Sequence, residues 1–335
     1  MKKSDISIKN LSIGYFLKGG RQKLVKSDIT QELYQGELTC LLGSNGSGKS
    51  TLLRTLAGFQ SALNGEVLYD RKSLKDYSDA ERSLLIGLVL TDKIYAGGIS
   101  VFDLVSLGRH PHTGFFGSLK EHDKQVVADS MQKVGIAHKS GSYVSELSDG
   151  ERQKAMIAKA LAQECPVILL DEPTAFLDIG SRFETMHLLK ELAVKEQKSI
   201  LISTHDIESA IRMADRFWLI DKELPFTSGI PEDLILNDTF SHFFDRDSSY
   251  FDKLTGTLQV VQENTKEIYL SGDALSCFWI SNALIKSGFK PIRENDGFPH
   301  IHCDCMNVYL FRNKESDKGV SYKSIEDLMI FINDI

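Results

Sequence analysis

Long apolar segments are missing from this sequence. It holds no run of 18 or more apolar residues, so no segment is expected to span a lipid bilayer. Residues 1–5 are followed by alternating residues and not by the apolar core that a secretory signal requires. The five cysteines are scattered and odd in number, which is typical of a reducing compartment without a disulfide framework. We therefore expect a cytoplasmic protein, and a role at a membrane would require a separate membrane subunit.

An excess of basic residues is also missing. The chain has 39 Lys and Arg against 46 Asp and Glu, and its formal net charge is −7. General nucleic-acid binding usually requires a basic patch or stripe, so no nucleic-acid partner is expected. No internal repeat or low-complexity tract is visible. The 335 residues, 42% of them hydrophobic, suffice for about two globular domains.

Short apolar runs alternate with helical periodicity in the first two thirds of the chain. The continuous apolar runs 166–171 and 199–204 are typical of strands buried on both faces of a parallel sheet. Strands that alternate with helices predict an α/β core. Segments near 100–108, 120–134 and 150–162 predict a helical subdomain at about 92–163. The remaining expected elements are strands at 5–12 and 37–42 and helices at 49–57 and 180–197.

The pattern of expected helices and strands changes after about residue 240. We expect one domain at 1–240 and a small α+β accessory domain at 241–335, although residues 239–244 are no flexible linker. Its role is open: it could regulate, dimerise or brace the first domain. One of its helices carries an apolar stripe expected to pack in the core, namely Leu275, Phe278, Trp279, Ala283 and Leu284. The expected strands are 254–261, 267–271, 299–305 and 307–312, and the expected helices are 274–287 and 322–333.

Residues 43–50, GSNGSGKS, fit the phosphate-loop pattern G-x-x-x-x-G-K-[ST] in full. An apolar strand precedes the loop and a helix follows it, as the pattern requires. Loop amides and the helix N-terminus favour anionic oxygens. Lys49 would reach the β- and γ-phosphates, and Ser50 would bind Mg²⁺. The alternative, a glycine-rich turn that binds nothing, fits the complete pattern poorly.

Two acids end the apolar strand before residue 173. Asp171 and Glu172 lie where ligands bind in open α/β sheets, at the carboxyl end of a strand. Asp171 would hold Mg²⁺ through water, and Glu172 would orient or deprotonate the attacking water. An acidic pair after a strand can also be a simple cap, but here it follows a complete phosphate loop.

Residues 147–153, LSDGERQ, precede that strand, and here the chain resembles the ABC ATPase family, whose signature usually reads LSGGQ. Further family motifs occur in order: Tyr15 resembles the aromatic residue that stacks on adenine, residues 176–178 resemble the D-loop, and His205 resembles the switch histidine. The resemblance covers about residues 5–235. It implies an α/β P-loop NTPase core and a head-to-tail homodimer that holds ATP and Mg²⁺ between one phosphate loop and the partner's signature motif.

The resemblance assigns individual roles. The γ-phosphate would meet Ser148 and the amide of Gly150 from the partner subunit. Catalytic roles would fall to Glu172, His205 and Lys49. Metal ligands would be Ser50, Asp171 and Thr91. Nucleotide-binding residues would be Tyr15, Gly43, Ser44, Asn45, Gly46, Ser47, Gly48, Lys49, Ser50, Thr51, Ser148, Gly150 and Asp178.

Two departures from the family pattern bear on hydrolysis. Asp149 and Glu151 stand where Gly and Gln are usual, and an extra carboxylate should repel a triphosphate unless it points away or toward a basic partner; Arg152 and Lys154 are close in sequence. The usual glutamine of the Q-loop is missing, and Thr91 is expected to replace it with shorter reach. We still expect ATPase activity.

Residues 108–111, GRHP, followed by an aromatic turn, resemble the ATPases of iron-siderophore, haem and cobalamin importers. The resemblance implies docking on an integral-membrane permease at the cytoplasmic face of the cell membrane. A periplasmic or lipoprotein substrate-binding protein would act indirectly. Phe115 and Phe116 would suit such docking or could belong to a local core. Open alternatives are an exporter ATPase, a non-transport ABC ATPase and a catalytically silent module.

Residues 300–305, HIHCDC, invite a metal interpretation. In a strand, however, His300, His302 and Asp304 share one face, while Cys303 and Cys305 lie on the other. We expect the cysteines to be small core residues. The His/His/Asp face is the better candidate if a metal binds.

Overall fold

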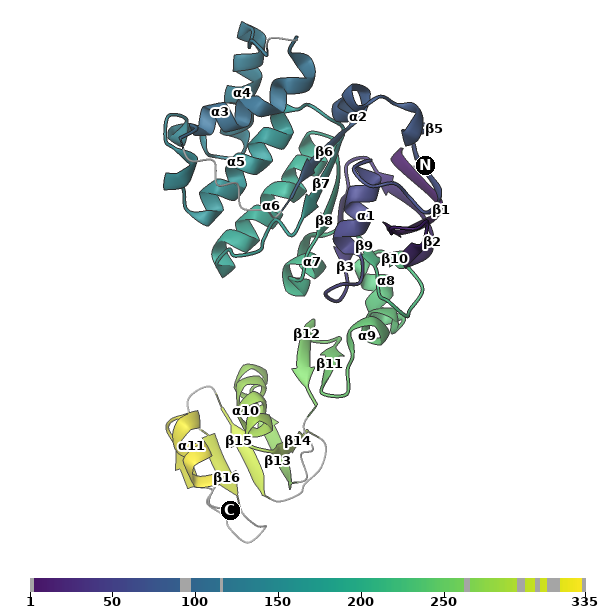
Figure 1. The fold of residues 1–335 in the computed structure, drawn as a ribbon. Coiled ribbons are helices and arrows are strands. Elements are labelled where there is room, and N and C mark those ends of the chain that lie inside the picture. Colours follow the sequence, from purple (N-terminus) through teal and green to yellow (C-terminus); the bar gives the residue numbers. More distant parts are fainter. Residues whose placement is uncertain are drawn as a thin grey trace. The chain divides into compact units, whose positions relative to one another are not determined.

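The computed structural model describes residues 3–90, 98–114, 117–261, 266–293, 299–304, 308–311 and 320–332. It divides into two compact units: residues 1–245 with 251–257, and residues 246–250 with 258–335 (Figure 1). The first unit therefore extends past residue 240, because Phe240 and Phe243 of helix α9 (Thr239–Phe244) are buried in its core. No helix in the described ranges is long and apolar enough to cross a membrane.

A six-stranded sheet with the order β10-β9-β3-β8-β7-β6 forms the centre of the first unit. Its strands are parallel except for β10, which pairs antiparallel with β9. This confirms the predicted α/β class. The strands are β3 (Leu38–Leu42), β6 (Ile86–Val89), β7 (Val167–Asp171), β8 (Ser199–Ser203), β9 (Arg216–Leu219) and β10 (Thr227–Gly229).

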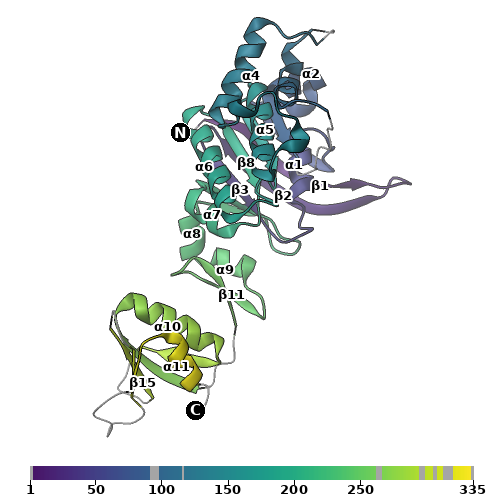
Figure 2. The ribbon, with the colours of Figure 1, turned by 90° about the vertical axis from the view of Figure 1, so that its left-hand side faces the viewer.

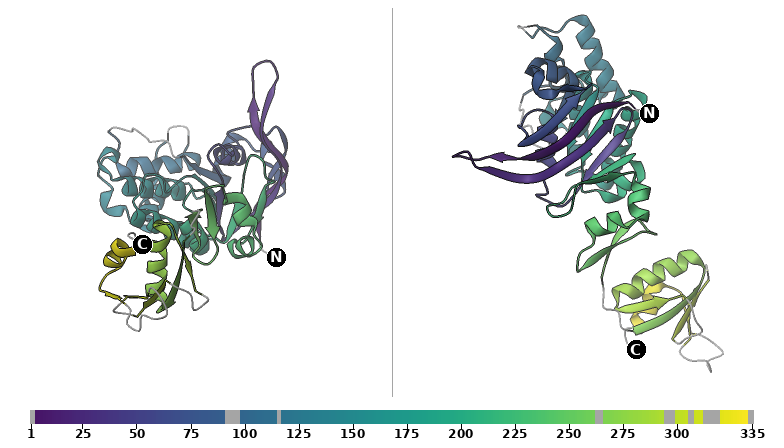
Figure 3. Two further views of the ribbon diagram at one scale, coloured as in Figure 1. Left: turned by 90° about the horizontal axis from the view of Figure 1, so that it is seen from below. Right: turned by 90° about the vertical axis from the view of Figure 1, so that its right-hand side faces the viewer.

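A second, antiparallel sheet of the first unit has the order β2-β1-β4-β5. The β1–β2 hairpin extends beyond the rest of this unit (Figure 3). The strands are β1 (Ser4–Phe16), β2 (Gln22–Tyr34), β4 (Asn64–Tyr69) and β5 (Lys72–Ser73). The first unit's other helices are α1 (Lys49–Leu56), α2 (Asp79–Leu85), α3 (Val101–Ser106), α4 (Glu121–Lys133), α5 (Asp149–Ala162), α6 (Ile179–Lys195), α7 (Ile207–Met213) and α8 (Pro231–Leu236), with 3₁₀ turns at Leu74–Asp76, Leu107–His112, Ala137–Lys139 and Val144–Glu146.

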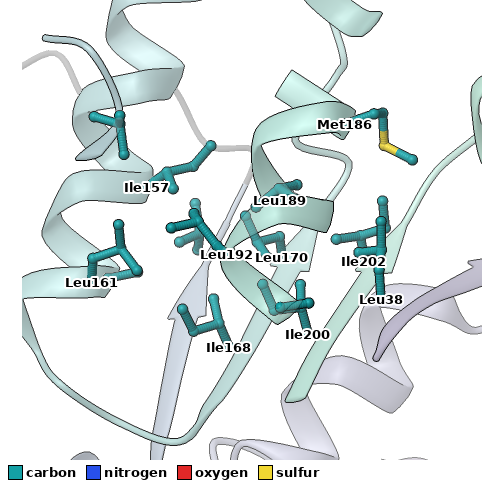
Figure 4. Close-up of a cluster of buried hydrophobic side chains, with 14 of the residues drawn as sticks. Leu38, Ile157, Leu161, Ile168, Leu170, Met186, Leu189, Leu192, Ile200 and Ile202 are labelled. Atoms are coloured by element: carbon teal, nitrogen blue, oxygen red, sulfur yellow. The ribbon is translucent and has the colours of Figure 1, made fainter. Parts of the chain in front are cut away.

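Both faces of the parallel sheet are buried, which explains its continuous apolar strands. Alternate residues of β7 point to opposite faces, so Ile168 and Leu170 join one core cluster and Val167 and Leu169 join the other. Helices α5 and α6 cover the first face (Figure 4). Helix α1 covers the second face with Leu52, Leu53 and Leu56.

Gly108 and Arg109 of the GRHP segment are buried within the helical subdomain, whereas His110 is exposed. Arg109 is 2% exposed; its guanidinium donates to Asp123 Oδ1 at 3.1 Å, to Glu164 Oε2 at 2.6 Å and to the Ala162 carbonyl at 2.7 Å. A Cβ at Gly108 would lie 2.2 Å from the Lys159 carbonyl oxygen, so only glycine permits this approach to α5. These two residues join the 3₁₀ turn to α4 and α5 and offer no exposed docking surface. Phe115 and Phe116 lie outside the described residues.

The second unit is a two-layer α/β structure. Its main sheet has the order β14-β13-β15-β16-β17; β14 and β15 run parallel to β13, and the other pairs are antiparallel. Helices α10 (Ala274–Lys286) and α11 (Ile325–Ile332) lie on one side of it (Figure 2). The strands of this sheet are β13 (Lys266–Gly272), β14 (Phe289–Ile292), β15 (His300–Cys303), β16 (Val308–Phe311) and β17 (Val320–Tyr322). A two-stranded hairpin of β11 (Ser249–Asp252) and β12 (Thr257–Val260) is divided between the units, because residues 251–257 belong to the first unit.

The predicted core stripe of α10 is wrong for three of its residues. Leu275, Phe278 and Trp279 are exposed, and Leu284 alone of the five is fully buried. The face toward the sheet carries Leu284 together with Cys277 and Ile280.

The alternation in β15 is as predicted: Ile301 and Cys303 are buried, whereas His302 is exposed. His300 Nε2 and His302 Nδ1 both lie within hydrogen-bond distance of Ser271 Oγ, at 2.7 and 2.9 Å. Among the described residues, no group of three His, Cys, Asp or Glu could hold a metal ion. Cys305 lies outside them.

Candidate nucleotide-binding site

A cavity of about 690 Å³ lies over the loop between β3 and α1. This volume lies in the range of pockets for small molecules and cofactors. The cavity combines backbone of the phosphate loop, three lysines and one carboxylate, a composition that suits a polyanionic ligand. Its described lining residues are Tyr15, Lys23, Leu24, Val25, Asn45, Gly46, Gly48, Lys49, Ser50, Thr51, Glu172 and Lys222.

Two glycines shape the loop itself. Gly48 has φ 112°, and a Cβ there would lie 2.6 Å from Val25 Cγ1. A Cβ at Gly43 would lie 2.0 Å from the Ile220 carbonyl oxygen. Side chains at these positions would force the loop away from its neighbouring strands. The backbone can therefore turn directly into α1, whose N-terminal amides favour anionic oxygens.

Lys49 holds its ammonium at the base of the cavity. The residue is 5% exposed, and its Nζ donates to the carbonyl oxygens of Gly43 at 2.9 Å and Ser44 at 3.3 Å. Burial lowers the pKa of Lys49, and the carboxylates of Glu172 and Asp171 act in the opposite direction. A phosphate oxygen could replace these carbonyls as the acceptor without moving the lysine far.

The two acids follow β7 and are anchored by the end of β8. Ser203 Oγ donates to Asp171 Oδ1 at 2.6 Å, and the Glu172 amide donates to the backbone and side-chain oxygens of Ser203 at 3.1 and 2.9 Å. Glu172 has φ 49°, so the chain turns sharply there. The adjacent parallel strands thus fix the backbone from which the Glu172 carboxylate reaches the cavity.

His205 lies between the cation and the carboxylate. Its Nε2 is 3.2 Å from Lys49 Nζ and 2.8 Å from Glu172 Oε1. A single ring nitrogen accepts from the ammonium when it is unprotonated and donates to the carboxylate when it is protonated. His205 can therefore serve only one of these two groups at a time.

The mouth of the cavity and its hydroxyl groups come from β1 and α1. Tyr15 is 43% exposed, and its hydroxyl lies 2.9 Å from Thr51 Oγ1. Ser50 lines the cavity beside Lys49. A Ser50 hydroxyl and an Asp171 carboxylate are hard oxygen ligands, the type that Mg²⁺ prefers. The donor set present thus fits Mg²⁺ bound with a triphosphate. Thr91 lies outside the described residues.

The signature motif begins α5, and its two carboxylates, those of Asp149 and Glu151, both contact groups of the same chain. Glu151 accepts from the backbone amide and the hydroxyl of Ser148 at 2.9 and 3.0 Å, and it pairs with Lys139 at 3.1 Å. The Ser148 amide and Lys139 lower the pKa of Glu151 to about 2. Asp149 pairs with Arg152 at 2.8 Å. Both carboxylates are therefore engaged within their own chain.

The signature and D-loop residues do not line this chain's own cavity as far as it is described. Lys154 pairs with Glu184 at 3.2 Å and not with the signature acids. Asp178 caps α6 by accepting from Ser181 N at 3.0 Å and Ser181 Oγ at 2.7 Å. The hydroxyl of Ser181 also lies next to Gly150. Ser148, Gly150 and Asp178 thus gather at the neighbouring starts of α5 and α6.

Sequence reasoning missed four lining residues. Three of them, Lys23, Leu24 and Val25, belong to β2. The fourth, Lys222, lies three residues after the end of β9. No motif marks them, because their position depends on how β2 and β9 pack around the phosphate loop. A search for alternating apolar and polar residues over 22–34 would have located β2, but it would not have shown that β2 lies close to the phosphate loop.

Comparison with known proteins agrees with this geometry. The family described as ABC transporter matches residues 27–175, and the family described as iron ABC transporter C-terminal domain matches residues 265–333. The ferric enterobactin transport ATP-binding protein FepC of Escherichia coli is 34% identical over 66% of this chain and 81% of that relative. The cobalamin import ATP-binding protein BtuD of Halobacterium salinarum is 31% identical over 89% of this chain and 78% of that relative.

A solved structure extends the likeness to the fold. The dimeric structure of a bacterial ABC transporter cassette superposes with a TM-score of 0.59 at 25% identity, over 68% of this chain and 98% of that one. The likeness therefore covers nearly the whole of that cassette and about two thirds of this chain. The chain belongs to the family of ABC transporter ATP-binding proteins, the ATPases of these transporters.

Proposed function

We propose that this chain hydrolyses ATP to energise an importer for an iron-siderophore, haem or cobalamin-type substrate. The observation that carries the proposal is that Lys49 and Glu172 line the cavity and that His205 lies within hydrogen-bond distance of both. These groups supply a cation for the transferred phosphoryl group, a carboxylate for the attacking water and a histidine that contacts both. Positioning and charge stabilisation of this kind provide most of the catalysis in phosphoryl transfer.

Each residue has a defined task in this reaction. The Lys49 ammonium stabilises negative charge on the phosphoryl oxygens. The Glu172 carboxylate orients the attacking water and accepts its proton. His205 exchanges its contact between Lys49 and Glu172, so it can respond to the γ-phosphate. Ser50 and Asp171 would hold Mg²⁺, which neutralises phosphate charge when it is bound.

A second copy of the chain would complete the nucleotide site. Ser148 and Gly150 lie outside the described lining of the cavity, although the N-terminus of α5 is a suitable partner for a phosphate. Beside them, Phe176, Ile179 and Phe183 are exposed by 68%, 85% and 51%. Such apolar exposure supports a subunit interface. Two copies would each present the start of α5 to the partner's triphosphate.

The transport role rests on the names of the relatives and on the family match of residues 265–333, which is described as iron ABC transporter C-terminal domain. FepC and BtuD are named for ferric enterobactin transport and cobalamin import. By this likeness, a permease in the cell membrane would be the direct partner at its cytoplasmic face, and an external substrate-binding protein would act through that permease. The transported substrate would not contact this chain.

The proposal is tested by Glu172→Gln in the full chain, assayed with its permease. Loss of the general base should lower the hydrolysis rate by about 10²–10⁴-fold while Mg-ATP still binds. The variant should also accumulate as a dimer in saturating Mg-ATP, as seen by size-exclusion chromatography with light scattering. Glu184→Gln, which alters an exposed carboxylate of α6, is the matched control and should hydrolyse at the wild-type rate. Equal rates for wild type and Glu172→Gln would contradict the proposal.

A further inference from the structure

A third lysine lines the nucleotide cavity besides Lys49 and Lys23, and no motif accounts for it. Lys222 is an exposed residue in the turn between β9 and β10. Its ammonium lies next to the phosphate loop, because a Cβ at Gly46 would lie 3.8 Å from Lys222 Nζ. Within the part of the chain that the structure describes, no hydrogen bond or ion pair engages this ammonium. Lys222 therefore offers a cation to a ligand of the loop.

The backbone of the phosphate loop packs directly on the residues before Lys222. The amide of Ile220 donates to the Leu42 carbonyl at 2.9 Å, and a Cβ at Gly43 would lie 2.0 Å from the Ile220 carbonyl oxygen. Further along the loop, a Cβ at Gly48 would lie 3.5 Å from Ile220 Cδ1. Backbone contacts two residues away thus set the place of Lys222 relative to the loop.

The turn that carries Lys222 is held from inside by another lysine. Lys26 of β2 is 8% exposed, and its Nζ donates to the carbonyl oxygens of Asp221, at 2.8 Å, and of Leu224. The Asp221 carboxylate accepts from the amides of Glu223 at 2.9 Å and Leu224 at 3.4 Å. A buried cation without its acceptors is costly, so Lys26 stabilises this conformation of the turn.

The charges that line the cavity are unequal in number. In its described lining, three ammonium groups face one carboxylate, that of Glu172. Lys49 contacts the loop at the Gly43 carbonyl, whereas Lys222 lies beside Gly46. The two cations thus meet different parts of the loop, and a chain of phosphate groups carries enough negative charge to attract both. The excess of positive charge favours a polyanion over a neutral ligand.

We infer that Lys222 is a further phosphate-binding residue of this site and that Lys26 positions it. The inference rests on the proposed function, because the ligand is the polyphosphate of Mg-ATP. Amides of a phosphate loop surround the α- and β-phosphates, which ATP and ADP share. Lys222 therefore strengthens the binding of both nucleotides. Among the described residues, it has no contact with Glu172 or His205, so it takes no part in the attack of water.

Equilibrium binding to the full chain tests the role of Lys222. Lys222→Gln removes the charge and keeps a long polar side chain, so the dissociation constants of Mg-ADP and Mg-ATP should both rise about tenfold. Isothermal titration calorimetry measures both, with Mg-ATP titrated in the Glu172→Gln background to prevent its hydrolysis. Lys222→Arg keeps the charge and should bind within about twofold of the parent. Lys124→Gln, which removes an exposed charge of α4, is the matched control and should bind as the parent does.

Lys26→Met tests the positioning role. It removes the ammonium that holds the turn, and it should weaken Mg-ADP binding by about the same factor as Lys222→Gln. The double variant should bind no more weakly than Lys222→Gln alone, because Lys26 acts through Lys222. Additive losses would overturn the positioning role. Lys222→Gln alters an exposed residue, so the main test stands even where Lys26→Met fails to fold.

Steady-state hydrolysis separates binding from chemistry. In Lys222→Gln, KM for Mg-ATP should rise about tenfold while kcat stays within about twofold of the wild-type value. A fall in kcat at unchanged KM would overturn the inference.

The binding outcomes separate this inference from the function on which it rests. A loss of affinity in Lys222→Gln that Lys222→Arg restores supports the inference. Parental affinity in Lys222→Gln, or an equal loss in Lys222→Arg or Lys124→Gln, overturns it and leaves the ATPase proposal standing if Glu172→Gln still abolishes hydrolysis. If the wild-type chain binds neither nucleotide, both proposals fail.

Discussion

The first unit places charged side chains around a ligand-sized cavity, whereas the second unit places large apolar side chains on an outer helix face. In the first, Lys49 is 5% exposed and stands against two carboxylates. In the second, Trp279 is 57% exposed although its unit has a complete apolar core of its own. Both arrangements are unfavourable for an isolated folded chain. Each becomes favourable when the matching ligand binds: a polyanion in one unit and an apolar surface in the other.

This difference in chemistry explains why the sequence marks one site with a motif and does not mark the other. A polyanion is bound by backbone amides and a lysine at fixed spacing, so its site reads as a motif. An apolar contact needs only several large residues on one helix face, and the same pattern describes a core. The first unit could therefore be assigned chemically from residues alone, and the second could not.

Removal of the buried cation should give the largest effect. Lys49→Ala takes away the group that meets the phosphoryl oxygens, and the hydrolysis rate should fall by about 10²–10³-fold. His302→Ala, which alters a polar group of the second unit, should leave the rate unchanged. The measurement is phosphate release by both variants with the permease present. An equal loss of hydrolysis rate in the two variants would contradict the assignment of catalysis to the first unit alone.

A second charge inside the first unit serves the fold rather than the nucleotide. Arg109→Met leaves Asp123 and Glu164 without their guanidinium partner, and the melting temperature should fall by on the order of 10 °C. Lys124→Ala removes only an exposed pair with Glu121 and should change it by about 1 °C. Differential scanning calorimetry compares them. Equal melting temperatures for wild type and Arg109→Met would show that the buried pair contributes nothing.

The smallest expected effect concerns the signature motif and depends on pH. The folded-state pKa of Glu151 is about 2, below the unfolded value near 4.5, so its contribution is present above about pH 4.5 and declines as pH falls toward 2. Glu151→Gln keeps a capping side chain but loses the charge, and it should lower the melting temperature by about 1–3 °C at pH 7. The gap to wild type should narrow below pH 4.5. A gap that stays constant from pH 7 to 3.5 would contradict the assigned pairing with Ser148 and Lys139.

Much of the first unit's fold could be predicted because its signals are local. Strand β7 and helix α5 start within one residue of their expected positions, since a continuous apolar run and a capping box define them. The strand order and the approach of β2 to the phosphate loop could not be derived, because they depend on long-range pairing. The pairing of Glu151 with Lys139, twelve residues earlier, was hidden for the same reason.

Helix α10 shows the limit of periodicity. The spacing of Leu275, Phe278 and Trp279 correctly indicates one face of a helix, but Cys277, Ile280 and Leu284 define another apolar face. Periodicity says which residues lie together and not which set meets the sheet. The wrong assignment followed from preferring the larger side chains for the core.

Each unit contains one of the chain's two tryptophans, and their surroundings are opposite. Trp218 is fully enclosed in the first unit, whereas Trp279 stands in solvent on the second. Indole emission depends on polarity, so the unlabelled protein contains a built-in pair of optical probes, one blue-shifted and one red-shifted. Quenching and spectral position can thus distinguish an event in the cassette core from one at the accessory surface without any dye.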